Sequence, residues 1–253
     1  MITENNDINS VFSDMNDISS RKTAGKVSFN TSSATDYFSN ESYKTLRTNM
    51  MFCSSDIKTI VITSCHENEG KSTVSSELAK SLAEIGKKTV LIDADLRKSV
   101  MLRKRSKDKE ILGLSELLSK QCDISQAIYS TQHDNFDVIF SGHFPPNPVE
   151  LLGSGEFEKL LDELKEDYDY IIVDTPPIGA VIDAAVVASV CDGAIFVISQ
   201  GMVSIREAQN AKEQLLKSGC KIIGAVINDV EKKQKQFYKR YKKAGYGYGN
   251  SYN

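Results

Sequence analysis

Short runs of apolar residues alternate with segments of helical periodicity along most of the chain. Apolar runs typical of buried strands occur at Ile57–Ile62, Thr89–Ile92, Phe136–Phe140, Tyr170–Val173, Ala194–Ile198 and Ile222–Ile227. Helical patterns lie between them, at residues 72–85, 157–165 and 205–217. Apolar strands separated by helices predict an α/β fold, in which a mostly parallel sheet is covered by helices on both faces.

The two ends of the chain have a different composition from the middle. Residues 1–36 are rich in Ser, Asn, Asp and Thr and poor in apolar residues, which predicts a flexible N-terminal arm. Residues 37–230 form the expected domain, which opens with a helical pattern from about Asn40 to Cys53. Residues 231–253 are rich in Lys, Tyr and Gly and form the expected flexible, basic tail.

The composition argues against nucleic-acid-binding, disulfide-rich, secreted and membrane-spanning proteins. A chain of 253 residues with 40% hydrophobic content suits one α/β domain, and a formal net charge of -3 argues against bulk nucleic-acid binding. The five cysteines form no C-x-x-C pair, as expected in a reducing compartment. The first residues do not resemble a signal peptide, and no apolar run approaches the roughly 18 residues of a membrane span. We therefore expect a cytoplasmic protein that reaches any membrane through a partner.

The first apolar strand runs into a segment with the features of a phosphate-binding loop. Gly70, Lys71, Ser72 and Thr73 follow a strand and precede a helix, as in the Walker A motif that binds ATP. Gly70 allows close backbone approach, Lys71 reaches the terminal phosphates, and the Ser72 hydroxyl is a candidate Mg²⁺ ligand. The usual first glycine is replaced by Cys65, so we expect Asn68 to adopt the left-handed backbone. The side chains of Glu67 and Glu69 are expected to point away from the phosphates, and the nucleotide is expected to contact residues 68–73.

Acidic residues follow two other strands. Asp93 and Asp95 end the second strand, and Asp174 ends the fourth. A carboxylate at the end of a buried strand is costly unless it is paired or lies near a metal. Asp174 matches a Walker B acid that holds Mg²⁺, with Asp95 as a second candidate ligand. Asp93, or else Asp95, is the candidate base that accepts a proton from an attacking hydroxyl, and Arg97 is a candidate to stabilise the transferring phosphate.

Taken together, these motifs resemble those of the bacterial tyrosine kinases of capsular and exopolysaccharide synthesis, which are related to the MinD/ParA P-loop ATPases. The resemblance rests on Gly70–Thr73, Leu91–Arg97, Ile171–Pro177 and the segment Ser141–Leu152, which reads SGHFPPNPVELL. It implies an Mg²⁺- and ATP-dependent kinase domain that phosphorylates its own tyrosines and other proteins of polysaccharide synthesis. It also implies a membrane-embedded activator of the polysaccharide co-polymerase type and a cognate tyrosine phosphatase.

The same resemblance implies ring-shaped homo-oligomers, in which each tail enters a neighbour's active site. Residues 41–53 are the candidate oligomerisation helix, and Glu41, Lys44 and Arg47 match the family's charged ring motif, with Lys44 in place of an arginine. Spacing of three places these side chains on one side of the helix. Charge spacing alone equally fits a solvated helix face.

The tail supplies the candidate acceptors of phosphate. Half of the chain's ten tyrosines lie there, among glycines and lysines that exclude a core: Tyr238, Tyr241, Tyr246, Tyr248 and Tyr252. Asn228, after the sixth predicted strand, is a candidate for reading the adenine edge.

Two other functions fit part of the pattern. A MinD/ParA-type switch ATPase would share the fold, but such proteins carry a second lysine early in the loop, where this chain has His66-Glu67-Asn68-Glu69. A non-enzymatic adaptor could use the basic tail on anionic lipid or RNA, although the tail has no apolar helical face. The tyrosine-rich tail favours the kinase over both.

Overall fold

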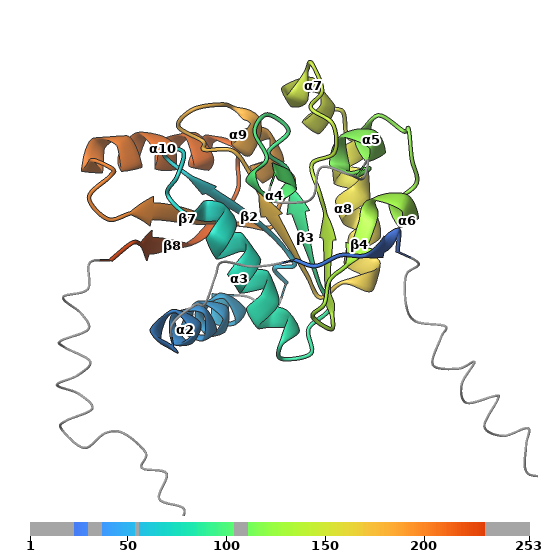
Figure 1. Ribbon diagram of the computed structural model, residues 1–253. Helices are drawn as coiled ribbons and strands as arrows, with labels where there is room; N and C mark the ends of the chain where they lie inside the picture. The colour runs from blue at the N-terminus through green and yellow to red at the C-terminus, as the bar shows by residue number, and fades with distance from the viewer. Residues whose placement is uncertain (1–22, 30–36, 54–55, 104–110, 231–253) are drawn as a thin grey trace, which may run out of the picture.

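A computed structural model describes residues 23–29, 37–53, 56–103 and 111–230 of the chain. Within them, one eight-stranded sheet has the order β1-β4-β5-β3-β6-β2-β7-β8 (Figure 1). The strands are β1 (Gly25–Lys26), β2 (Thr59–Ser64), β3 (Thr89–Asp93), β4 (Ile128–Ser130), β5 (Phe136–Ile139), β6 (Tyr170–Asp174), β7 (Gly193–Ser199) and β8 (Ile222–Asn228). All six predicted strands are present, and the predicted α/β class with a mostly parallel sheet is confirmed.

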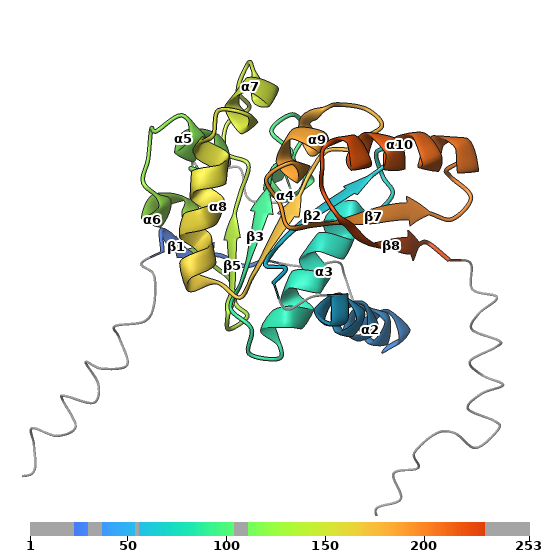
Figure 2. The same ribbon diagram turned by 180° about the vertical axis from the view of Figure 1, so that it is seen from behind.

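Helices connect the strands and cover both faces of the sheet (Figures 1 and 2). The longer ones are α2 (Tyr37–Cys53), α3 (Lys71–Ala83), α8 (Glu156–Asp167) and α10 (Ile205–Lys217). Five short helices complete the described chain: α4 (Val100–Arg103), α5 (Leu114–Leu118), α6 (Ile124–Ala127), α7 (Pro148–Leu152) and α9 (Asp183–Ala188). The sequence pattern did not predict these five, because four to six residues are too few for a helical period to repeat.

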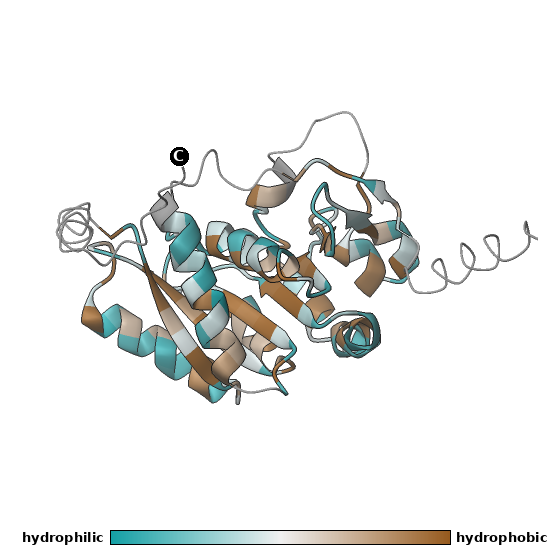
Figure 3. Cartoon of the chain, turned by 90° about the horizontal axis from the view of Figure 1, so that it is seen from below, coloured by the Kyte–Doolittle hydropathy of each residue, from teal (hydrophilic) through white to brown (hydrophobic). Residues whose placement is uncertain are grey.

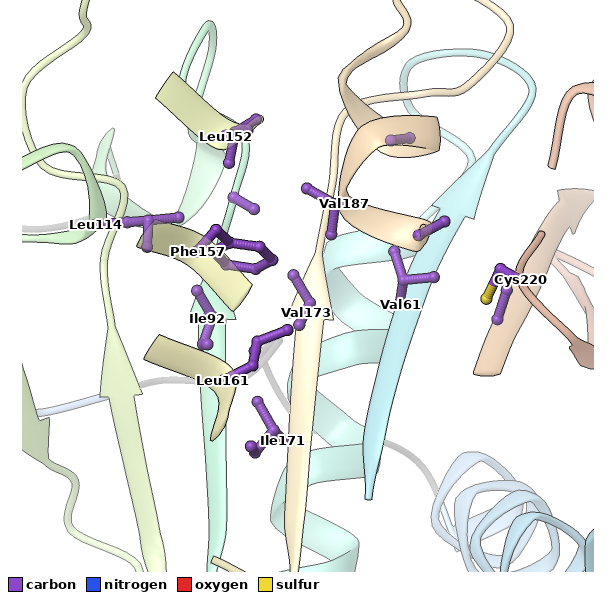
Figure 4. Packing of buried hydrophobic residues seen from close by; sticks show 14 of the residues in the cluster. Val61, Ile92, Leu114, Leu152, Phe157, Leu161, Ile171, Val173, Val187 and Cys220 are labelled. Carbon is purple, nitrogen blue, oxygen red and sulfur yellow. The ribbon is translucent and has the colours of Figure 1, made fainter. Parts of the chain in front are cut away.

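The alternation of side chains along each strand divides the core into two layers. Val61, Ile92 and Val173 point to one face, where they pack with Phe157 and Leu161 of α8 (Figure 4). Their neighbours in sequence point to the other face, against α2 and α3. Viewed from below, apolar strands lie between helices whose outer surfaces are hydrophilic (Figure 3). Burial on both faces explains why these strands have continuous apolar runs.

The N-terminal arm predicted for residues 1–36 is wrong for residues 23–29. β1 pairs in parallel with β4, and the side-chain amide of Gln132 bonds both the N–H and the carbonyl of Phe29 at 2.7 Å. The ring of Phe29 is buried, with its centroid 5.5 Å from that of Phe136. A two-residue strand gives almost no periodic signal, so composition dominated the prediction. β4, which was not predicted, pairs antiparallel with β5.

The strand order brings the predicted motifs together. β2 lies between β6 and β7, and β3 lies between β5 and β6, so the segments after β2, β3 and β6 leave one edge of the sheet. Ligands bind at this carboxyl edge in parallel sheets. Among the described residues, no helix has the length and apolar character to cross a membrane.

Candidate active site

The phosphate loop has left-handed backbone at two positions. Asn68 has a φ of 65° and Gly70 a φ of 83°, which confirms the left-handed conformation expected at Asn68. Asparagine tolerates this region better than most other non-glycine residues, so it serves where a glycine is more usual. α3 begins at Lys71 immediately after Gly70, and its first backbone N–H groups therefore face the loop.

The buried carboxylate of Glu69 stabilises the loop by hydrogen bonds within it and to the next strand. It is fully buried and accepts hydrogen bonds from the N–H of His66 at 2.5 Å and from the N–H of Ser199, at the end of β7, at 2.9 Å. The side chain of Glu69 joins the loop to the neighbouring strand, and its expected orientation away from the phosphates stays a prediction. Sequence reasoning missed this structural role, because no local pattern marks the partner at Ser199.

Asn228 holds the same loop from β8. Its Nδ2 atom donates to the carbonyl of Glu69 at 3.0 Å. Gly70 has a left-handed backbone, and a Cβ atom there would lie 2.1 Å from that nitrogen, so a side chain at this position would strain the backbone and displace Asn228. The predicted adenine-reading role of Asn228 stays a prediction, since the structure gives this amide a bond within the protein.

Two side-chain contacts lie on the outer side of the loop. Glu67 pairs with Lys98 at 2.6 Å, and His66 pairs with Glu207 of α10 at 3.2 Å. All four side chains are exposed, so neither contact contributes much to stability. Glu67 links the loop to the segment after β3.

Asp93 and Asp174 lie side by side, because β3 and β6 pair in register at these two positions. Ser99 Oγ donates to Asp93 Oδ2, and Ser75 Oγ of α3 donates to Asp174 Oδ1 at 2.9 Å. Both carboxylates are almost completely buried. The sequence predicted the pair but not the two serines, whose spacing from the motifs carries no signal by itself.

Burial of two neighbouring acids changes their protonation. Burial, the nearby charge of Asp174 and that of Asp95 raise the pKa of Asp93 to about 8, against the opposing effect of the Ser99 hydrogen bond. Burial also raises the pKa of Asp174, although Lys71, Ser72 and Ser75 oppose that rise. The site therefore carries an excess of buried acid that a cation would stabilise.

The segment after β3 positions Asp95 and Arg97. Asp95 Oδ1 accepts from the N–H groups of Arg97 at 3.2 Å and Lys98 at 2.9 Å, which fixes the turn. The Arg97 guanidinium forms a two-point ion pair with Asp183 of α9, at 2.8 and 3.0 Å. Asp183 is fully buried, and no local sequence motif marks it as part of the site. Arg97 is thus held at the rim of the site by an acid.

The donor set fits Mg²⁺. No group of three or more His, Cys, Asp or Glu side chains in the described parts of the chain could hold a metal alone. Mg²⁺ is typically held by one or two carboxylates together with water and phosphate oxygens. Asp174, the hydroxyl of Ser72 and Asp95 carry oxygen atoms of the kind that would suit such a site beside the loop.

The predicted oligomerisation residues make contacts within the chain. Lys44 pairs with Glu41 at 2.8 Å on the exposed side of α2. Arg47 Nη1 instead donates to the carbonyl of Ser81, at 2.5 Å, and to its hydroxyl, at 3.0 Å, in α3. Arg47 therefore joins α2 to α3, and the ring interface stays a prediction. The five tail tyrosines lie outside the described residues.

The sheet order, the loop before α3 and the acids after β3 and β6 define a P-loop nucleotide-binding protein. A family model described as an AAA domain matches residues 57–222. The cell-division ATPase MinD of Pyrococcus furiosus superposes with a TM-score of 0.57 at 25% identity, over 67% of this chain and 71% of that one.

More specific relatives are tyrosine kinases. Tyrosine-protein kinase CpsD of Streptococcus agalactiae is 44% identical over 190 residues, which cover 75% of this chain and 83% of the relative. The kinase domain of the Escherichia coli tyrosine kinase ETK superposes with a TM-score of 0.71 at 34% identity, over 85% of this chain and 80% of that one. The chain belongs to this family of bacterial tyrosine-protein kinases.

Proposed function

We propose that this protein is an Mg²⁺- and ATP-dependent protein-tyrosine kinase of capsular or extracellular polysaccharide synthesis, and that its acceptors include tyrosines in its own tail. The observation that carries the proposal is the cluster of Lys71, Asp93 and Asp174 beside a phosphate loop. Membership of the tyrosine-kinase family and a tail with five tyrosines favour this function over a switch ATPase.

Each residue of the site has a physical role in this reaction. The N–H groups at the start of α3 and the Lys71 ammonium bind the phosphates of ATP, while Glu69 and Asn228 hold the loop in its bound shape. Asp174, Ser72 and Asp95 would hold Mg²⁺, which neutralises charge on the phosphate oxygens. Arg97, positioned by Asp183, lies at the rim, where charge develops on the transferring group.

Asp93 is our first candidate for the base that accepts the phenolic proton. Asp93 lies at the end of β3 directly beside Asp174, and its buried carboxylate can accept a proton at the edge where the phosphate loop ends. Asp95 is the second candidate, since it follows the same strand and is slightly less buried. A tyrosine suits the recessed site because its long, rigid side chain reaches further than serine.

The partners are proposed from the family. We infer a membrane-embedded activator of the polysaccharide co-polymerase type that recruits this protein to the inner face of the membrane. We also infer a homo-oligomer, with a ring as the expected form, that presents each tail to a neighbour. A cognate tyrosine phosphatase would reverse the modification, and other proteins of polysaccharide synthesis would be substrates.

Replacement of the phosphate-loop lysine tests the function. Lys71→Met should lower tyrosine autophosphorylation at least about 100-fold, because the lysine supplies charge to the transferring phosphate. Lys80→Met, later in the same helix, is the matched control and should retain activity. Phosphotyrosine content after incubation with labelled ATP is the measurement. Equal phosphorylation of the Lys71→Met variant and the wild type would reject the assignment.

A further inference from the structure

The segment Ser141–Leu152 has no part in the catalytic site described above, although it carries much of the family resemblance. It follows β5, the strand next to β3, and together with α5 it lines a pocket of about 510 Å³. A volume of this size is typical of sites for small ligands. α5 and α7 lie at the same end of the sheet as the arrowheads of β2 and β3 (Figure 1). None of the catalytic residues lines the pocket, so it is a separate site.

Three serines that line the pocket donate their hydroxyl protons within the chain. Ser115 Oγ donates to Glu116 Oε1 at 2.9 Å. Ser119 Oγ and Ser154 Oγ donate to backbone carbonyls of the preceding turn, at 2.6 and 2.8 Å. A hydroxyl has one proton and two lone pairs, so each of these oxygens can still accept a hydrogen bond. The serines therefore favour a ligand that donates hydrogen bonds.

The start of α7 contributes an amide and a carboxylate to the same pocket. Asn147 occupies the N-cap position of α7 but makes no capping hydrogen bond with its side chain. An asparagine at an N-cap usually accepts from a backbone N–H of the first turn, so this amide is instead available to a ligand. Glu150 is exposed in the first turn of α7. The amide can both donate and accept, and the carboxylate can accept from two hydroxyl groups.

The pocket also presents the faces of rings. Pro145, Pro146 and His143 line it. The Nδ1 atom of His143 lies 2.9 Å from Oε1 of Glu116, a buried carboxylate, and this contact fixes the orientation of the imidazole. Rings that are already held in place can pack against the C–H groups of a ligand at little cost in side-chain entropy.

This combination of groups argues against most classes of small ligand. None of the described residues that line the pocket is lysine or arginine, so a phosphate or carboxylate would lack a charged partner. An apolar ligand would take water away from Asn147 and Glu150 without replacing its hydrogen bonds. A saccharide carries hydroxyls that both donate and accept, together with C–H faces that pack on rings. It therefore matches the serine oxygens, the amide, the carboxylate and the ring faces at once.

We propose that this pocket binds an uncharged saccharide, with its hydroxyls on Asn147, Glu150 and the serine oxygens and its C–H face on the proline rings. The class of ligand follows from the pocket and does not depend on kinase activity. Only the source of the saccharide rests on the proposed function, because a protein of polysaccharide synthesis would meet the sugar units of that polymer.

Titration calorimetry tests the site without any kinase activity. The protein is the full chain carrying Lys71→Met, without ATP. The probes are glucose, galactose, N-acetylglucosamine and neutral oligosaccharides from partial hydrolysis of the polysaccharide made by the producing cells. Asn147→Asp and Glu150→Gln keep the shapes of the side chains, and together they should weaken binding at least about tenfold, because they exchange donors and acceptors. The matched control is Glu158→Gln, an exposed acid in the first turn of α8 that does not line the pocket.

The site and the kinase can fail separately. No binding of any probe, or equal binding to the double variant and the control, would overturn the saccharide site and leave the kinase untouched. Saccharide binding by a protein that shows no tyrosine phosphorylation would leave the pocket assigned and reject the kinase instead. Added salt should not change the Kd, because the ligand is uncharged. Binding of spermidine in place of the saccharides, with loss of binding in salt, would overturn the class of ligand.

Nuclear magnetic resonance locates the bound saccharide without any substitution in the pocket. The side-chain amide signals of Asn147 and Gln121, which both line the pocket, should shift as the saccharide is added. The amide of Asn210, exposed on α10, is the control and should not shift. Shifts confined to Asn68 and Asn228 would place the saccharide at the phosphate loop and overturn the proposal.

Discussion

At the scale of single residues, the site depends on side chains that never touch the nucleotide in the proposed reaction. Glu69 is the clearest example, because its buried carboxylate joins the loop at His66 to β7 at Ser199. Its neighbour Glu67 has the same side chain but lies outside, paired with Lys98. The two glutamates are separated by one residue, so their variants compare a buried, hydrogen-bonded carboxylate with an exposed ion pair.

Glu69→Gln should destabilise the protein by about 1–3 kcal/mol, because one of two buried N–H donors loses a charged acceptor. The Kd for Mg-ATP should rise several-fold as the loop loosens. Glu67→Gln is the control and should change stability by less than about 1 kcal/mol, because its ion pair is exposed. Urea unfolding and nucleotide titration measure the two effects. Equal behaviour of the two variants would show that Glu69 does not stabilise the loop.

Residues in local sequence motifs could be predicted, whereas residues whose partners lie far away in the chain could not. The phosphate loop, Asp93, Asp95, Arg97 and Asp174 were found because each lies in a local motif at a strand end. Asp183 and Ser199 were missed, since their partners lie 86 and 130 residues away in the chain. No local pattern specifies such contacts, which follow only from the order of strands in the sheet.

At the scale of elements, the long strands and helices were predicted and the short ones were not. α10 was predicted at residues 205–217 and runs from Ile205 to Lys217, because its period repeats over three turns. β1 has two residues and is held by partners from a distant segment, Gln132 and Phe136. The polar composition of residues 1–36 predicts a flexible arm, because one aromatic residue at Phe29 gives no strand pattern.

Phe29→Ala tests whether residues 23–29 belong to the domain. The ring is buried against Phe136 and Phe140, so its loss should cost about 2–4 kcal/mol of unfolding free energy. Lys26→Ala is the control on the exposed strand β1 and should be nearly neutral. Thermal and urea unfolding measure both variants. If Phe29→Ala is as stable as Lys26→Ala, the strand does not contribute to the fold.

The charged helix α2 has two different sides. Arg47 binds Ser81 of α3, whereas Glu41 and Lys44 form an exposed pair. Arg47→Ala should therefore lower stability by about 1–2 kcal/mol, because it removes hydrogen bonds from a charged donor. The double variant Glu41→Ala, Lys44→Ala should keep the stability of the wild type and shift a ring toward monomers. Light scattering that shows the same assembly in the double variant would reject the exposed pair as the ring interface.

At the scale of the whole molecule, the account separates a catalytic domain from the segment that it modifies. Within the part of the chain that the structure describes, the last strand of the sheet ends at Asn228, and the five tail tyrosines follow it in the sequence. Acids lie at the catalytic edge, while the tail carries lysine and arginine. This charge difference draws a tail to the site. Each added phosphate brings about −1.5 to −2 charges, so phosphorylation would release the tail.

The measurement that tests the central claim most directly is phosphate transfer from a chain ending at Val230 to a full-length Lys71→Met chain. A membrane fraction from the cells that produce the protein supplies any activating partner. The truncated chain retains the whole sheet, so it should bind Mg-ATP and phosphorylate the acceptor, which cannot phosphorylate itself. Mass spectrometry of the acceptor should find phosphate on one or more of Tyr238, Tyr241, Tyr246, Tyr248 and Tyr252. An unmodified tail, with both chains folded and ATP bound by the donor, would contradict the kinase and favour a switch ATPase.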